Sequence, residues 1–436
     1  MKPPSFPARP RVLAAVLLLA SSVLGAAPAR ALSLQDAAEL ALQNDPRLRA
    51  ADAQVQSSAA GVDLARAGYL PTASFSGSTG AQRYYLPASL SQAFPLPGVL
   101  NPTSGSIRAS QPLYNGGLTG AQMASSRGQL EGARADEDAT SQRLLLEAAT
   151  AYLDLERDRV VVDYNQSNLA ALQQELSDSN KRFAAGEATR TDVAQATARV
   201  AEALAGLKRA MAQGQVGEAA FMRVIGVPPD ALASGWPQPP VPANLDQALA
   251  SAGLTPEVLA AEAQARSARA QIDAARAAWM PKVSLDAQGT AQGDSQFAND
   301  RYKDWSVLLK ASLPLYEGGA TRARVAQAKA QAAVAQAQAE DAHNAVRETI
   351  TQAWALLQAD DELTRAYQSD LEASSLALED VHKELDAGTR TTKDLLDAER
   401  DRLSAQVNLT GSLHDRAVVA FQLLEACGKL KLEDVK

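Results

Sequence analysis

The sequence predicts an α+β membrane protein made of a duplicated unit, in which a β-hairpin is followed by long coiled-coil helices. Three observations predict this fold: the two halves of the 436-residue chain repeat each other, two long stretches lack proline, and short segments before them alternate polar and apolar residues. Aromatic residues make up only 5% of the chain, which argues against two compact enzyme-like cores. An elongated helical architecture is therefore expected.

Residues 1–31 have the features of a cleaved secretory signal. Lys2, Arg9 and Arg11 precede an apolar run at 12–20, and the small residues Ala29 and Ala31 form a cleavage site. The run is too short to cross a bilayer, which needs about 20 apolar residues in a helix. The mature chain is therefore expected to begin at Leu32.

The charge and cysteine content exclude several kinds of partner and anchor. Without the four basic residues of the signal, 38 basic side chains face 50 acidic ones, so the mature chain is acidic and nucleic acid is not expected as a partner. The only cysteine is Cys427. We therefore expect no intrachain disulfide and no lipidation at the mature N-terminus.

The duplication sets the expected domain organisation. Residues shared at an offset of 210 are Gln54, Ser57, Asp63, Arg66, Ala67 and Pro71, which return as Gln264, Ser267, Asp273, Arg276, Ala277 and Pro281. From Ile107 onward the offset is 202. Repeat 1 is assigned to 32–226, a Pro- and Gly-rich linker to 227–244, repeat 2 to 245–426 and a C-terminal tail to 427–436.

Each repeat begins with a helix and a β-hairpin. Helices are expected at 46–68 and 256–278, each ending before a proline. Alternating segments then predict strands at 72–82 and 104–114 in repeat 1, and at 282–292 and 305–316 in repeat 2. The hairpins therefore occupy about 72–114 and 282–316.

Two long helices are expected after the hairpins, because proline is absent from 113–227 and from 315 to the end. Apolar residues recur every seven positions, which is typical of a coiled-coil seam. The seam residues are Ala148, Leu155, Val162, Leu169, Leu176 and Phe183, then Ile350, Leu357, Leu371, Leu378 and Leu385, with Thr364 in the gap. Gly186 and Gly388 mark the turns at which each chain segment doubles back.

Four such strands cannot close a barrel alone, and an open sheet edge in lipid leaves backbone groups without hydrogen bonds. Other copies of the chain must therefore complete the sheet. Aromatic residues at the helix-side ends of the strands are typical of an outer-membrane barrel with an interfacial girdle. These residues are Tyr69, Tyr114, Trp279 and Tyr316.

The whole mature chain resembles the TolC-type outer-membrane efflux and secretion channels. Three motifs carry this resemblance. The first is Gln111 to Gly117, which includes Pro112, Gly116 and Gly117 and lies at a strand-to-helix junction, and the second is its counterpart Leu313 to Gly319, which includes Pro314, Gly318 and Gly319. The third is Gly388 to Thr391, followed by Asp394 to Ala398. The resemblance implies a homotrimer with a twelve-stranded β-barrel continuous with a periplasmic α-barrel. It further implies a passive exit duct, opened by a periplasmic adaptor and an inner-membrane transporter of the ABC, RND or MFS type.

The resemblance also implies a gate where the helices turn. Arg390 would pair with the Thr191–Asp192 segment, and Asp394 with Asp397 would form acidic rings that narrow the lumen. The two aspartates are three residues apart, so they share one helix face. Leu385 stands where related sequences can carry tyrosine, so one hydrogen bond of the latch is absent.

Simpler interpretations exist for these residues. Arg390 and Asp192 could form solvated ion pairs at helix turns, and Asp394 and Asp397 could lie on a solvated helix face. The paired glycines are interpreted as backbone hinges, because no phosphate-binding pattern surrounds them.

An enzyme is not expected. His343, His382 and His414 lack metal-ligand spacing, and no serine or cysteine lies in a recognised nucleophile motif, so we predict no cofactor and no catalytic residue. The alternative is a secreted periplasmic coiled-coil adaptor or adhesin without a barrel. The exported substrate stays open in either case.

Overall fold

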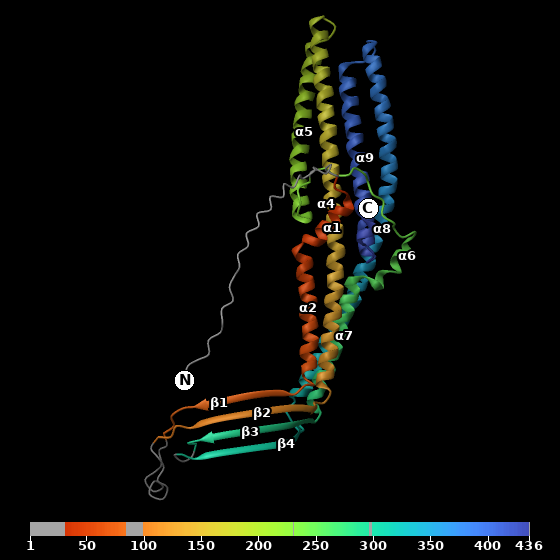
Figure 1. Ribbon diagram of the computed structural model, residues 1–436. Helices are drawn as coiled ribbons and strands as arrows, with labels where there is room; N and C mark the ends of the chain where they lie inside the picture. The colour runs from red at the N-terminus through yellow and green to blue at the C-terminus, as the bar shows by residue number, and fades with distance from the viewer. Residues whose placement is uncertain (1–30, 84–98, 230, 296–298, 436) are drawn as a thin grey trace, which may run out of the picture.

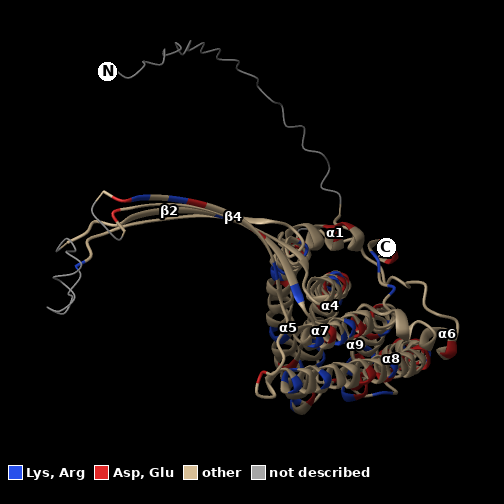
Figure 2. Ribbon diagram, turned by 90° about the horizontal axis from the view of Figure 1, so that it is seen from below, with Lys and Arg blue, Asp and Glu red and all other residues tan. Residues whose placement is uncertain are grey.

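The computed structural model describes residues 31–83, 99–229, 231–295 and 299–435. The predicted signal lies outside the described residues, apart from Ala31. A sheet lies at one end of the elongated molecule and the turns of two long helical hairpins lie at the other, with α1 and the C-terminus between them (Figure 1). Viewed along the helices, the sheet extends to one side of them (Figure 2).

The sheet has four antiparallel strands in the order β1-β2-β3-β4. They are β1 (Thr72–Thr79), β2 (Thr103–Tyr114), β3 (Lys282–Gly293) and β4 (Arg301–Ser312). One row across the sheet runs Phe75, Ile107, Gly289 and Trp305. The hairpins of the two repeats therefore join edge to edge through β2 and β3.

Two strands differ from the predicted limits. β4 begins and ends four residues before the predicted 305–316, and β1 ends at Thr79, after which a single bridge joins Gln82 to Leu100. Pro314, the counterpart of Pro112 in repeat 2, explains part of the early end of β4, because proline has no backbone N–H to donate to a neighbouring strand. Pro112 stays within β2, which β1 and β3 flank, beside a bulge, whereas Pro314 follows the end of the edge strand β4.

Long helices account for most of the chain. They are α2 (Pro46–Ala67), α4 (Leu118–Ala184), α5 (Arg190–Ile225), α7 (Pro256–Arg276), α8 (Ala320–Asp386) and α9 (Thr392–Ala426). The 67 residues of α4 and of α8 each correspond to about 100 Å of helix. The predicted α+β fold of long helices and antiparallel hairpins is confirmed.

The seam residues become less buried from the middle of α4 and α8 toward the helical turns. Ala148, Leu155 and Leu169 of α4 are buried, as are Ile350 and Leu357 of α8. Nearer the turns, the seam residues are only partly buried, and Phe183 is exposed. The single chain therefore leaves much of the upper seam open to other partners.

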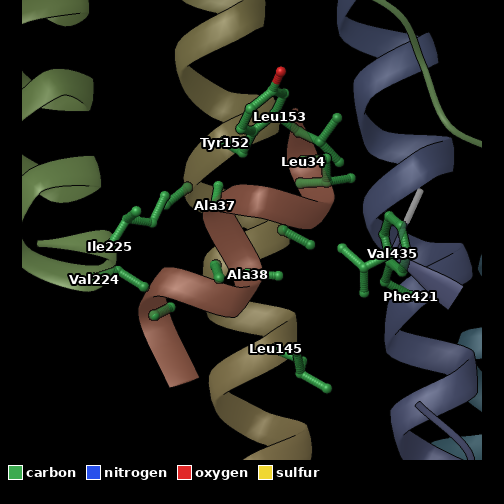
Figure 3. Close-up of a cluster of buried hydrophobic side chains, with 14 of the residues drawn as sticks. Leu34, Ala37, Ala38, Leu145, Tyr152, Leu153, Val224, Ile225, Phe421 and Val435 are labelled. Atoms are coloured by element: carbon green, nitrogen blue, oxygen red, sulfur yellow. The ribbon is translucent and has the colours of Figure 1, made fainter. Parts of the chain in front are cut away.

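The largest core lies halfway along the helices, where α1 (Leu34–Asn44) crosses α4, α5 and α9 (Figure 3). Tyr152 is buried there, and its hydroxyl lies 2.9 Å from the carbonyl oxygen of Leu32 and 2.7 Å from that of Ala233. Burial raises the pKa of this phenol to about 12. The start of the predicted mature chain is thus fixed to the middle of the molecule.

The linker and the C-terminal tail both pack against the core in the middle of the helices. Leu232 and Trp236 of the linker contact the core, and Leu430 and Val435 of the tail are buried in it. The short helix α6 (Leu245–Leu249) and the 3-10 turns at Ala252–Leu254 and Leu432–Asp434 also lie in this middle region, whereas the 3-10 turn at Ala277–Trp279 joins α7 to β3 at the sheet end. Cys427 is buried in a second cluster between α6, α8 and α9.

Within the described residues, no helix combines the length and apolar character needed to cross a bilayer.

Candidate functional site

The two helical hairpins turn with the same local structure. α4 ends at Ala184, and Gly186 follows its C-cap with φ +79°; the amides of Gly186 and Glu187 donate to the carbonyls of Phe183 and Arg182. α8 ends in the same way at Asp386, and Gly388 follows with φ +75°. This is the Schellman arrangement, which favours glycine because other residues are strained at positive φ.

Each return helix begins with a capping box. The Asp192 carboxylate accepts hydrogen bonds from the amide and hydroxyl of Thr189 at 2.8 and 2.7 Å. Asp394 accepts from the amide and hydroxyl of Thr391 at 3.0 and 2.8 Å. These bonds, led by the one from the backbone amide, lower the pKa of both carboxyl groups.

The predicted Arg390 latch does not form within one chain. Arg390 Nε donates to Glu384 of its own hairpin at 2.7 Å, and both side chains are about half exposed. Asp192 is occupied by its capping box, and Thr191 is exposed. Arg390 has no counterpart in repeat 1, where Ala188 occupies the equivalent position.

Asp397 instead joins the two hairpins. Its carboxylate lies 2.7 Å from Arg199 of α5, and both side chains are about one-third exposed or less. Leu396, the preceding residue, is buried against Leu169 and Ala196 of the first hairpin. No pattern in the sequence points to Arg199, because this contact joins residues almost 200 positions apart with no shared motif.

A groove beside the second turn brings the predicted acidic residues together. Asp394, Asp397 and Arg390 line it with Asp370 and Asp401, and its volume is about 590 Å³. Four carboxylates and one guanidinium give the groove an excess of negative charge. Of the predicted gate residues, the chain therefore groups those of the second hairpin and keeps Thr191 and Asp192 apart from them.

The paired glycines connect strands to helices. Gly117 and Gly319 precede α4 and α8 with φ of +84° and +85°, and Gly116 and Gly318 also have positive φ. At Gly116, an added Cβ would lie 2.5 Å from Cβ of Met280. The positive φ values favour glycine at these four positions, and at Gly116 the close approach of Met280 leaves no space for a Cβ.

The sheet has one polar face and one apolar face. On the polar face, serines of β1 and β2 pair at 2.8 Å (Ser76 with Ser106, Ser78 with Ser104), and Lys310 lies 2.8 Å from Asp286. The opposite face carries Phe75, Ile107, Leu285, Trp305, Val307 and Leu309, all exposed in the single chain. Leu308 and Tyr302 are exceptions, since both are exposed on the polar face.

The edges of the sheet are open. Among the described residues, β1 pairs only with β2, and β4 pairs only with β3. Tyr69, Tyr114, Trp279 and Tyr316, at the helix-side end, are all exposed. The sheet thus offers an exposed apolar surface with aromatic residues along one border and two edges able to pair with other strands.

Metal chemistry has no site in the part of the chain that the structure describes, since no group of His, Cys, Asp and Glu there could hold an ion. His414 is buried between Asp154 and Asp415, with its ring nitrogens 3.0 and 2.8 Å from their carboxylates. Its position in the helical core is that of a packing residue.

Comparisons with known proteins identify the family. The sequence profile of the family "Outer membrane efflux protein" matches residues 37–227 and 244–429. The outer membrane efflux protein BepC of Brucella suis is 30% identical, over 99% of this chain and 92% of its own. The alkaline protease secretion protein AprF of Pseudomonas aeruginosa is 25% identical, over 93% of this chain and 86% of its own.

Solved structures agree with this assignment at the level of fold. The CmeC outer membrane channel of Campylobacter jejuni superposes with a TM-score of 0.81 at 15% identity, over 92% of this chain and 89% of its own. A crystal structure of CusC, whose study concerns folding and transmembrane channel formation, superposes with a TM-score of 0.81 at 20% identity, over 91% of this chain and 92% of its own. With its two repeats, both hairpins and both helical turns accounted for, the chain belongs to the outer membrane efflux protein family.

Proposed function

We propose that three copies of this chain form a passive exit duct in the outer membrane, with four strands from each copy in a twelve-stranded barrel. The single observation that carries this proposal is the two-faced sheet with open edges at β1 and β4. In lipid, these edges need partners, and an apolar outside with a polar inside suits a water-filled barrel.

The helices continue the duct into the periplasm. Figure 1 shows both helical hairpins extending away from the sheet in one direction, with the strands running across the helices, and Figure 2 shows the sheet extending to one side of them. We therefore also propose that the sheet turns into line with the helices when three copies assemble, so that barrel and helices enclose one tunnel. The duct itself carries out no catalysis; a periplasmic adaptor and an inner-membrane pump open and load it. The family relatives named for efflux and for protease secretion support this role, and the pump determines the cargo.

The gate is part of the same proposal. Arg390 reaches Asp192 of a neighbouring copy when the mouth is closed, since the two residues do not meet within one chain. Asp394 and Asp397, repeated three times, form acidic rings beside it. A ring of carboxylates at a constriction favours cations.

Cross-linking tests the assembly. Cysteines replace Ser76 of β1 and Ser306 of β4, both on the polar face, in a Cys427→Ser background. A short bismaleimide should yield a ladder that ends at three copies, because β4 of one copy lies beside β1 of the next.

The control is the pair Ser106→Cys and Thr290→Cys, which face each other on β2 and β3 of one chain. This pair should give only intrachain links. A monomer that remains soluble without detergent would contradict the duct and favour the adaptor or adhesin.

A further inference from the structure

The apolar face of the sheet carries charge at only one place. Side chains on this face belong to every second row of paired residues, counted from the row that contains Phe75. In the described strands, all residues in these rows are uncharged except two at the start of β4. There, Arg301 pairs with Gly293 and Lys303 pairs with Ala291, so both cations lie on the apolar face. They are at the end of the sheet farthest from the helices.

These two side chains lack acidic partners. Neither Arg301 nor Lys303 forms an ion pair or side-chain hydrogen bond with any residue that the structure describes. On the polar face, by contrast, Lys310 is paired with Asp286, and Arg108 donates to Gln288 at 3.1 Å. Lys282 and Asp304 of the polar face have no such partner among the described residues. What distinguishes Arg301 and Lys303 is therefore that they are two unpaired cations next to each other on an otherwise apolar face.

Small residues beside the cations leave a hollow. Gly105, Ala291 and Gly293 line a shallow pocket of about 280 Å³ together with Arg301 and Lys303. Trp305 lies one row further along the same face and is 81% exposed. One end of this surface is therefore cationic, and the rest is apolar.

We propose that Arg301 and Lys303 bind the phosphate of an anionic outer-leaflet lipid, with its acyl chain over the small residues toward Trp305. The proposal rests on the proposed function, because only a barrel spanning the outer membrane places this end of the sheet at outer-leaflet height. Guanidinium and ammonium groups are strong phosphate donors, and long basic side chains at a membrane border extend toward headgroups.

A lipid phosphate fits better than a free one. The backbone amides around the pocket belong to strands that pair in a continuous ladder, so two exposed side chains alone would hold a free phosphate. The apolar surface beside them adds binding only for a ligand that has a hydrocarbon chain.

The test uses the full chain purified in dodecyl maltoside, with diphosphoryl lipid A as the probe and native mass spectrometry to count bound lipid. The double variant Arg301→Gln with Lys303→Gln should weaken binding by about tenfold or more, a change in Kd that corresponds to about 1.4 kcal/mol. Monophosphoryl lipid A should bind less than the diphosphoryl form to the unaltered chain.

The matched control is Lys282→Gln, which removes a positive charge from the polar face at the opposite end of the sheet. It should bind lipid A as the unaltered chain does. Equal binding by the double variant would overturn the site, and displacement of the lipid by equimolar inorganic phosphate would overturn its assignment to lipid. Flotation of the same proteins with outer membranes tests the barrel independently of lipid A binding: a variant that still floats but no longer binds lipid A has lost the lipid site and kept the barrel.

Discussion

Asp192 and Asp394 each have a structural task at the first turn of a return helix, whatever their effect on the lumen. Each accepts the amide hydrogen of its N-cap threonine, and this contact keeps both carboxyl groups ionised over a wider pH range. Substitution by alanine would therefore disturb the helix start together with the charge. Asparagine keeps an acceptor oxygen and is the cleaner substitution.

Arg390→Ser should raise planar-bilayer conductance several-fold, because it removes the cation proposed to hold the closed mouth. Asp192→Asn should act in the same direction, and the double variant should add little to either change, as expected for two members of one contact. Glu384→Gln is the control, since Glu384 is the partner of Arg390 within its own hairpin. An equal rise in Glu384→Gln would assign the effect to that local pair and reject the latch.

Asp394→Asn and Asp397→Asn should distinguish the effect of negative charge in the groove from the effect of the Asp397–Arg199 ion pair. Both should reduce the preference for cations, measured as reversal potential in a salt gradient, since each removes a carboxylate from the acidic groove. Only Asp397→Asn should also raise conductance, because it weakens the bond to Arg199 between the hairpins. Arg199→Ala should reproduce that rise. Unchanged selectivity in both aspartate variants would place these residues on an ordinary solvated face.

Glu156 provides a pH-dependent prediction in the helical core. Its Oε1 accepts from the amide of Gly235 at 2.6 Å, and its Oε2 is buried without a partner among the described residues. Burial raises the pKa of this carboxyl above its ordinary value of 4.5. The folded state thus binds the proton more tightly than the unfolded state, and the charged form destabilises the fold at neutral pH.

Glu156→Gln should therefore be more stable than the unaltered chain at pH 7.5. The difference should shrink as the pH falls from the raised pKa toward 4.5, where the unfolded state also becomes protonated. Thermal unfolding followed by circular dichroism checks this. The exposed Glu372→Gln on α8 serves as the reference, and a constant advantage at all pH values would contradict the titration argument.

At the scale of elements, the strand-to-helix junctions combine backbone strain with close packing. Gly116 and Gly117 both have positive φ, but only Gly116 also approaches Met280 and Ala277. Gly117→Ala should lower the free energy of unfolding by about 1–2 kcal/mol, the cost of a left-handed conformation with a side chain. Gly116→Ala should cost more, because a Cβ there has no space.

The control for this pair is Gly61→Ala, in the middle of α2, where an added Cβ contacts nothing within 4 Å. It should stabilise the chain slightly, since alanine favours helix over glycine. Thermal unfolding of the three variants gives the order directly. Equal effects at Gly116 and Gly117 would show that packing against Met280 contributes nothing.

For the whole molecule, the middle of the helices anchors the start of the mature chain. The amide of Leu32 donates to the carbonyl of Ala231 at 2.7 Å, and its carbonyl accepts from Ala233 at 3.0 Å. We predict that exported protein begins at Leu32, because cleavage after this residue would remove both bonds. Intact-mass measurement checks the cleavage site, and an added fatty-acyl mass would contradict the prediction that the N-terminus carries no lipid.

The sequence by itself determined the features that depend on neighbours within a few residues. Proline-free stretches with a heptad period predicted α4 and α8, alternation predicted four strands, and Gly186 and Gly388 predicted the turns. The capping boxes at Thr189 and Thr391 were not predicted from the sequence, although threonine with an acidic residue three positions later is a local signal for them. These features hold whichever segments pack together.

Only the tertiary structure decided which distant groups meet. It joined β2 to β3 and ended β4 before Pro314. It placed Asp397 on Arg199 of the other hairpin, and it left Arg390, whose partner Glu384 belongs to its own hairpin, apart from Asp192 of the same chain. The physical reason is that a side chain's partner depends on how helices hundreds of residues apart align, and a one-residue change in that alignment would present a different face. Local periodicity fixes the face of each helix, and packing alone selects what that face contacts.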